Sequence, residues 1–199
     1  MAVQHTTLPI FTVRSIRAAA ADRTPVKGLT HDFYRYPARF SPAFVASVIE
    51  HFTKPGQVVL DPYMGGGTTI VEAYARHRYA VGCDLNSLAV FVAKAKITTL
   101  TDQEKNSLLR WAKETVQKLS YNTPISDLSE VICIDRTRNL NIPRSRPAKK
   151  LIALAMQSAK RLRTEGARNF AKAVLLNVAQ WALHNRKVTP SLTDIRNRI

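Results

Sequence analysis

The spacing of apolar residues changes several times along the chain, and each change predicts a different element. A helix is expected from Ser41, a good N-cap that is followed by proline at the first helical position. Its apolar residues recur at helical spacing: Phe44, Val45, Val48, Ile49 and Phe52. Lys54-Pro55-Gly56 ends this helix. The short apolar run at 57–64 then favours a buried parallel strand.

A glycine-rich turn follows this strand, and the pattern then returns to helical spacing. Residues 69–78 are expected to form a helix, 79–86 a second strand, and 87–97 a further helix. Strand, glycine turn, helix and strand in this order predict a βαβ unit. The run 129–135 is a candidate third strand.

The regions on either side have different patterns. Residues 1–30 are expected to be irregular, because breakers stand at Pro9, Pro25 and Gly28. Thr101 and Glu104 predict a capping box and a helix after it. Helices are also expected at 147–163 and 167–185, and 191–199 is a candidate for a last one. We therefore divide the chain into an irregular segment (1–30), an α/β half-domain (31–135) and a basic helical region (136–199).

Charge separates the last of these regions from the rest of the chain. Residues 1–135 hold 15 Lys and Arg against 12 Asp and Glu, whereas 136–199 hold 15 against 2. A surplus of +13 in so short a region favours a polyanion such as a nucleic acid over a merely well-solvated surface. Arg161, Arg163 and Arg168 are the first candidates for phosphate contacts.

Several classes of protein do not fit the sequence. Cys83 and Cys133 are too far apart for a C-x-x-C motif, and we expect neither a disulfide framework nor a metal site. No apolar run reaches the roughly 20 residues that span a bilayer, so no membrane partner is expected. The first residues do not resemble a secretory signal, and we expect a cytoplasmic protein.

The glycine turn has the properties of a ligand site. Gly65, Gly66 and Gly67 permit close approach of the backbone to a ligand at a helix N-terminus. Asp84 ends the next strand 19 residues after Gly65, a spacing at which an acidic side chain accepts hydrogen bonds from ribose hydroxyls. Ile70 excludes the dinucleotide fingerprint G-x-G-x-x-G, and no Lys follows as in a P-loop. A tight strand-to-helix connection without a ligand is the structural alternative.

Residues 58–86 resemble the cofactor motifs of DNA methyltransferases that modify adenine N6 or cytosine N4. The family's first motif reads Asp-Pro-Phe-x-Gly-Ser-Gly-Thr-Thr, and the matching positions here are Asp61, Pro62, Gly65, Gly67, Thr68 and Thr69. Tyr63 replaces the phenylalanine and Gly66 replaces the serine. The family's acidic ribose ligand corresponds to Asp84.

The segment upstream also resembles this family, in the motif that contacts the methionine end of the cofactor. The matches are Pro37, Ala38, Phe40 and Pro42, with Arg39 where a basic residue is common. The resemblance implies S-adenosylmethionine as cofactor and DNA as substrate. The residues that it implies for cofactor binding are Pro37, Ala38, Arg39, Phe40, Asp61, Pro62, Tyr63, Gly65, Gly66, Gly67, Thr68, Thr69, Asp84, Leu85 and Asn86.

The tetrapeptide that carries catalysis in this family is absent. It consists of Asp, Ser or Asn, then Pro-Pro, then Tyr or Phe, and the sequence contains no Pro-Pro. We therefore assign no catalytic residue. The fold class expected is α/β, an incomplete Rossmann-like methyltransferase sheet followed by a basic helical segment. The catalytic half would lie in a second polypeptide or a missing C-terminal half, or the chain is a degenerate remnant.

Three functions compete at this stage. The first is the cofactor-binding part of a DNA methyltransferase, as in restriction–modification systems. The second is a non-catalytic DNA- or RNA-binding module with a vestigial methyltransferase fold, and the third is a methyltransferase for RNA or a small molecule. His31, Tyr36 and Asp135 are further candidates for the cofactor pocket. Trp111 and Trp181 have helical spacing and are interpreted as core residues rather than base-stacking platforms.

Overall fold

A computed structural model describes residues 7–37, 39–123, 145–184 and 188–199. The chain divides into two compact units, residues 1–97 (unit 1) and 98–199 (unit 2). The boundary lies earlier than residue 136, where the sequence analysis began its basic region. The reason is that helix α5 (Asp102–Lys118) packs against the later helices α7 (Arg146–Ala159) and α8 (Glu165–Leu183).

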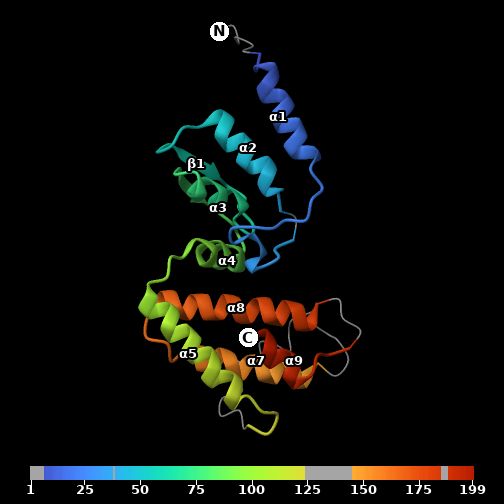
Figure 1. Ribbon diagram of the computed structural model, residues 1–199, viewed down its shortest axis with the longest axis vertical. Helices are drawn as coiled ribbons and strands as arrows, with labels where there is room; N and C mark the ends of the chain where they lie inside the picture. Colours follow the sequence, from blue (N-terminus) through green and yellow to red (C-terminus); the bar gives the residue numbers. More distant parts are fainter. Residues whose placement is uncertain (1–6, 38, 124–144, 185–187) are drawn as a thin grey trace. The chain divides into compact units, whose positions relative to one another are not determined.

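Unit 1 is a mixed α/β unit, mostly helical, with a two-stranded parallel sheet. Its elements in chain order are α1 (Ile10–Ala21), the 3-10 turn η1 (His31–Phe33), α2 (Pro42–Phe52), β1 (Val58–Asp61), α3 (Thr68–Ala75), β2 (Tyr79–Gly82) and α4 (Ser87–Ile97) (Figure 1). Val58 pairs with Tyr79, and Asp61 pairs with Gly82. The predicted βαβ unit is confirmed. The candidate third strand at 129–135 lies outside the described residues.

The two faces of this sheet are covered differently. Val59 and Ala80 point to one face, where they pack against Val45 and Ile49 of α2 and Ala73 of α3. The side chains that alternate with them are those of Val58, Leu60, Tyr79 and Val81. Each of these residues is at least half exposed. Within the described residues, one face of the sheet is therefore apolar and open to solvent.

The expectation that residues 1–30 are irregular is wrong for residues 10–21, which form α1. This helix packs against α2, and the Ser15 and Ser47 hydroxyls are 3.1 Å apart. Its last turn consists of alanines 18–21, which have the highest helix propensity. Pro9 precedes α1 as its N-cap rather than interrupting it.

Unit 2 is helical in its described residues, which form α5, α7, α8 and α9 (Leu192–Arg198). Its core is one cluster centred on Leu151, Leu175 and Ile195, none of which is exposed. The predicted capping box of Thr101 and Glu104 begins α5, so that prediction is confirmed. The Thr164 hydroxyl, which caps α8, also donates to Glu104 at 2.7 Å and joins the starts of the two helices.

Candidate functional site

Local hydrogen bonds extend the β1–β2 ladder into the glycine turn. The Cys83 amide donates to the Asp61 carbonyl at 3.0 Å, and the Met64 amide donates to the Cys83 carbonyl at 3.0 Å. Gly67 caps the start of α3 with φ of +77°, a conformation that L side chains rarely adopt. The turn therefore opens α3 at the carboxyl ends of both strands.

Gly66 is a glycine for a steric reason. A Cβ at this position would lie 2.5 Å from Cβ of Tyr36, well inside the distance at which two carbons pack. The family motif has serine here, and in this chain the Tyr36 side chain takes the space beside the turn. A Cβ at Gly67 would similarly lie 2.7 Å from Cβ of Ala93 in α4.

Asp84 joins the turn to the end of β2. Its carboxylate accepts hydrogen bonds from the Gly65 amide at 2.9 Å and from the Asn86 amide at 2.8 Å, one on each oxygen. The acidic side chain and the turn, 19 residues apart in sequence, are therefore in direct contact. Each carboxylate oxygen retains a further lone pair, so the half-buried Asp84 keeps acceptor capacity for hydroxyl groups.

Tyr36 reaches from the turn to the residue after this acidic position. A Cβ at Gly65 would lie 3.5 Å from Cδ1 of its ring, and the Asn86 side-chain amide donates to its hydroxyl at 3.0 Å. The sequence analysis named Tyr36 as a further candidate for the cofactor pocket. The structure brings it together with Gly65, Gly66 and Asn86.

Lys96 of α4 is a site residue that the sequence analysis missed. Its ammonium donates to the Gly66 carbonyl at 2.8 Å, and the residue is only 4% exposed. The pKa of Lys96 is lowered to about 8, mainly by burial and also by the Arg39 charge, while the Asp32 charge opposes both. The signal was present in the sequence, because Lys96 falls at helical spacing from Ala89, Val92 and Ala93 and interrupts an otherwise apolar face.

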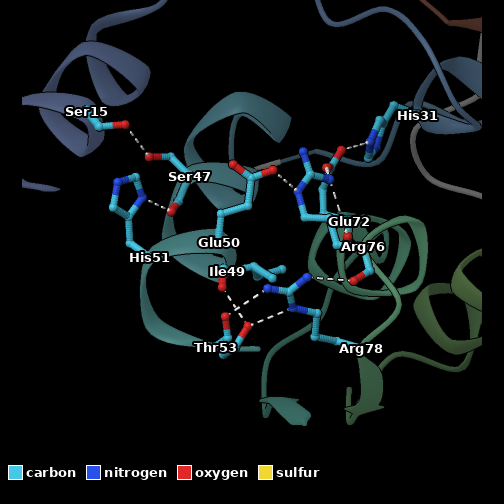
Figure 2. Close-up of polar contacts among 10 residues, drawn as sticks. All are labelled: Ser15, His31, Ser47, Ile49, Glu50, His51, Thr53, Glu72, Arg76 and Arg78. Atoms are coloured by element: carbon cyan, nitrogen blue, oxygen red, sulfur yellow. Dashed lines mark hydrogen bonds and ion pairs between the residues drawn. The ribbon is translucent and has the colours of Figure 1, made fainter. Parts of the chain in front are cut away.

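A buried polar network holds the segment that leads to Tyr36. His31 Nε2 lies 2.5 Å from a carboxylate oxygen of Glu72, and both side chains are buried (Figure 2). The Arg76 guanidinium pairs with the other oxygen of Glu72, and its Nε donates to Glu50 at 2.8 Å. Arg39 donates to the His31 carbonyl at 3.0 Å. His31 therefore belongs to a network that fixes the upstream segment against α3 and α2.

The other residues predicted to bind cofactor differ in their exposure. Those that are exposed are Pro37, Phe40, Pro62, Tyr63 and Leu85, of which Leu85 is wholly exposed. Thr68 is buried and Thr69 half-buried in the first turn of α3, and the Asp61 carboxylate accepts from the Tyr63 amide at 3.1 Å. Ala38 lies outside the described residues, as does Asp135.

The predicted DNA contacts lie in unit 2, where the three arginines have different surroundings. Arg161 and Arg163 line a groove of about 440 Å³ between α5 and α7. Arg168 instead donates to the Leu162 and Arg163 carbonyls, both at 2.8 Å. These hydrogen bonds stabilise the connection between α7 and α8.

The described part of the chain contains neither a candidate metal site nor a candidate membrane-spanning helix. It contains no group of three or more His, Cys, Asp or Glu side chains that could hold a metal ion. None of its helices is both long and apolar enough to cross a membrane.

Comparison with known proteins finds relatives that are named as methyltransferases. Type II methyltransferase M.MvaI of Kocuria varians is 30% identical over 120 residues, which cover 56% of this chain and 26% of that protein. Type II methyltransferase M.MjaII of Methanocaldococcus jannaschii is 25% identical over 92 residues, 46% of this chain and 17% of that protein. The DNA adenine methyltransferase YhdJ of Escherichia coli is 24% identical over 103 residues, 52% of this chain and 35% of that protein.

This chain therefore spans between 17% and 35% of the length of these relatives. No solved structure matches it. The model of a DNA methylase family, that of the N6 and N4 enzymes, matches residues 16–95. The matched range contains the upstream segment, the glycine turn, Asp84 and the first two turns of α4. Over these residues, the chain is similar to the amino-group (N6/N4) DNA methyltransferases.

Proposed function

We propose that residues 31–97 bind S-adenosylmethionine at the glycine turn, for methyl transfer to an exocyclic amino group of adenine or cytosine in DNA. One observation carries the proposal. Asp84 hydrogen-bonds to Gly65 in the turn that opens α3 at the carboxyl ends of β1 and β2. Ligands of open α/β sheets bind at this end, and an acidic residue there accepts hydrogen bonds from ribose hydroxyls.

Two side chains of opposite charge contact neighbouring residues of the turn, and these charges suit the two ends of this cofactor. Asp84 contacts Gly65 and would hold the ribose, whereas Lys96 contacts Gly66 and would attract the methionine carboxylate. Arg39 adds a second positive charge on the Lys96 side. Asp84 and Lys96 together would set the direction in which the cofactor lies.

In this proposal, the residues that activate the target amine belong to a polypeptide segment outside these 199 residues. The amine is reached only when its base is flipped out of the stack, and it must then be oriented for transfer. The sequence contains no Pro-Pro motif to do this. The open apolar sheet face of Val58, Leu60, Tyr79 and Val81 is a surface that such a partner would cover.

A second candidate function is a DNA-binding module whose methyltransferase fold no longer binds cofactor. Tyr36 favours it, because its side chain lies against Gly65 and Gly66 on the turn that a ligand would approach. The two candidates differ in one measurable property. An enzyme part binds S-adenosylmethionine, whereas a vestigial module does not.

Methyl transfer is tested with tritium-labelled S-adenosylmethionine and mixed-sequence DNA. The 199-residue chain alone is expected to give no incorporation, since positioning of the acceptor supplies much of a transferase's rate. Addition of a second polypeptide that carries a Pro-Pro-Tyr or Pro-Pro-Phe motif and the remaining strands is expected to restore it. The E. coli relative serves as positive control, and strong incorporation by the chain alone would contradict this division of labour.

A further inference from the structure

Unit 2 contains a groove lined by basic and aromatic side chains, none of which belongs to the proposed cofactor site. It lies between one face of α5 and the C-terminal half of α7 with the residues that follow it, and its volume is about 440 Å³. Its lining includes Arg110, Trp111, Glu114, Leu154, Arg161 and Arg163. A volume of roughly 300–1,000 Å³ is typical of small-ligand sites.

The lining is strongly positive. Arg110, Arg161 and Arg163 are exposed, and within the described residues none of them forms an ion pair with a carboxylate. Glu114 is the acidic side chain among the described lining residues, and it lies 3.9 Å from Lys118 in an exposed and therefore weak pair. The groove therefore presents several guanidinium groups that are available to an anion.

The groove also contains an aromatic side chain that is held in place. Trp111 donates from its indole nitrogen to the Ser158 hydroxyl at 2.9 Å. Ser158 in turn donates to the Ala155 carbonyl at 2.7 Å, and its oxygen lies 3.0 Å from the Thr115 hydroxyl. Trp111 packs against the core of unit 2 and lines the groove as well, so one residue serves both.

From these observations we infer that the groove binds one nucleotide of single-stranded DNA, with the base against Trp111 and the phosphates on Arg110, Arg161 and Arg163. Bare phosphate would leave the apolar surface of Trp111 and Leu154 uncovered, whereas a nucleotide covers it. Stacking of bases on aromatic side chains beside a basic track is the general mode of single-strand recognition. The inference goes beyond the proposed cofactor site, and its test needs no cofactor.

The test uses the full chain and a labelled 12-residue single-stranded oligodeoxynucleotide of mixed sequence. Arg161→Ala is expected to weaken binding about tenfold and to reduce the slope of log K against log salt by about 0.7, the value for one phosphate contact on a single strand. Lys113→Ala is the matched control, because Lys113 is exposed on α5 and does not line the groove. Its effect is expected to stay below twofold.

Fluorescence tests the aromatic part independently. Trp111 and Trp181 are the two tryptophans of the chain, so Trp181→Phe leaves Trp111 as the single reporter. Saturating oligonucleotide is expected to quench its emission strongly, and an abasic oligonucleotide of equal charge is expected to quench it much less. If Trp181→Phe does not fold, the same comparison is made on the parent chain with Trp111→Phe as reference. Equal losses in Arg161→Ala and Lys113→Ala, or Trp111 emission that saturating DNA leaves unchanged, would overturn the inference.

Discussion

Gly66 and Tyr36 illustrate how one pair of residues shapes the candidate site. The serine of the family motif would place its Cβ 2.5 Å from Cβ of Tyr36, so the serine and this arrangement of Tyr36 exclude each other. Sequence comparison alone records a lost hydroxyl at this position. The structure gives the reason, which is that the upstream segment packs directly on the turn.

We therefore predict that Gly66→Ala destabilises unit 1 by about 1–3 kcal/mol, because the Tyr36 backbone has to shift. Urea unfolding of unit 1, followed by hydrogen exchange of its amides, measures the effect. Gly166→Ala is the control, since its added Cβ would lie 3.1 Å from a carboxylate oxygen of Glu104, a milder contact than 2.5 Å from another Cβ. A Gly66→Ala protein as stable as the parent would show that the two segments do not pack as described.

Lys96 gives a prediction about pH. Its pKa is lowered to about 8, mainly by burial, so the amine loses its charge as pH rises through that value. The charged form attracts a carboxylate, and the part of S-adenosylmethionine affinity that depends on Lys96 should therefore be present below pH 8 and decline above it. Titration of the ligand itself affects both proteins equally. The ratio of parent affinity to Lys96→Met affinity, measured as a function of pH, therefore reports the contribution of Lys96 alone.

The same variant separates a role in ligand binding from a role in holding the turn. Lys96→Met is expected to weaken binding of S-adenosylmethionine by about 10- to 100-fold. Binding of the decarboxylated analogue, which keeps the sulfonium and the amine, should change little. Lys94→Met, an exposed lysine on the same helix, is the control. Equal losses for both ligands would leave Lys96 as a support of the Gly66 carbonyl and nothing more.

At the scale of elements, the network of His31, Glu72, Arg76 and Glu50 holds the upstream segment in place (Figure 2). Glu72→Gln removes the buried charge that both His31 and Arg76 contact, and we expect it to cost about 1–3 kcal/mol of unfolding free energy. Glu50→Gln is the matched control, because the Glu50 side chain is 55% exposed and such pairs contribute about 0–1 kcal/mol. Similar costs for the two variants in urea unfolding would contradict this assignment.

How far the sequence predicts the elements depends on how local their causes are. The βαβ unit, the Thr101–Glu104 capping box and the helix from Pro42 follow from spacing and capping chemistry within a few residues. The contact of Asp84 with the turn follows from the parallel connection of two short strands. The role of Lys96 was not predicted, since it depends on how α4 packs against the turn. Helix α1 was missed because the flanking prolines were given more weight than its alanines.

At the scale of the whole molecule, the chain combines a unit with the methyltransferase motifs and a helical unit that contains most of the positive charge. This division changes how DNA binding should be tested. A chain cut at residue 135 would leave α5 without α7 and α8, against which it packs. A cut after Ile97 keeps unit 1 whole.

We predict that duplex DNA binds the full chain without sequence preference, and that log K falls steeply with log salt because several phosphates are contacted. Residues 1–97, checked for folding by circular dichroism, should bind far more weakly. Fluorescence anisotropy at several salt concentrations measures both proteins. Equal affinity of the two would place the DNA contacts in unit 1 and contradict the assignment to the basic region.

The most direct test of the central claim is calorimetric titration of S-adenosylmethionine into the full chain and into Asp84→Asn. The claim is that the cofactor lies on the turn with its ribose on Asp84. The substitution keeps the shape of the side chain and one acceptor, but it removes the charge that strengthens these hydrogen bonds. We expect the parent to bind one equivalent and Asp84→Asn to lose about 1.5–3 kcal/mol of binding free energy. A parent chain that binds no cofactor, or an Asp84→Asn chain that binds it as tightly as the parent, would contradict the account.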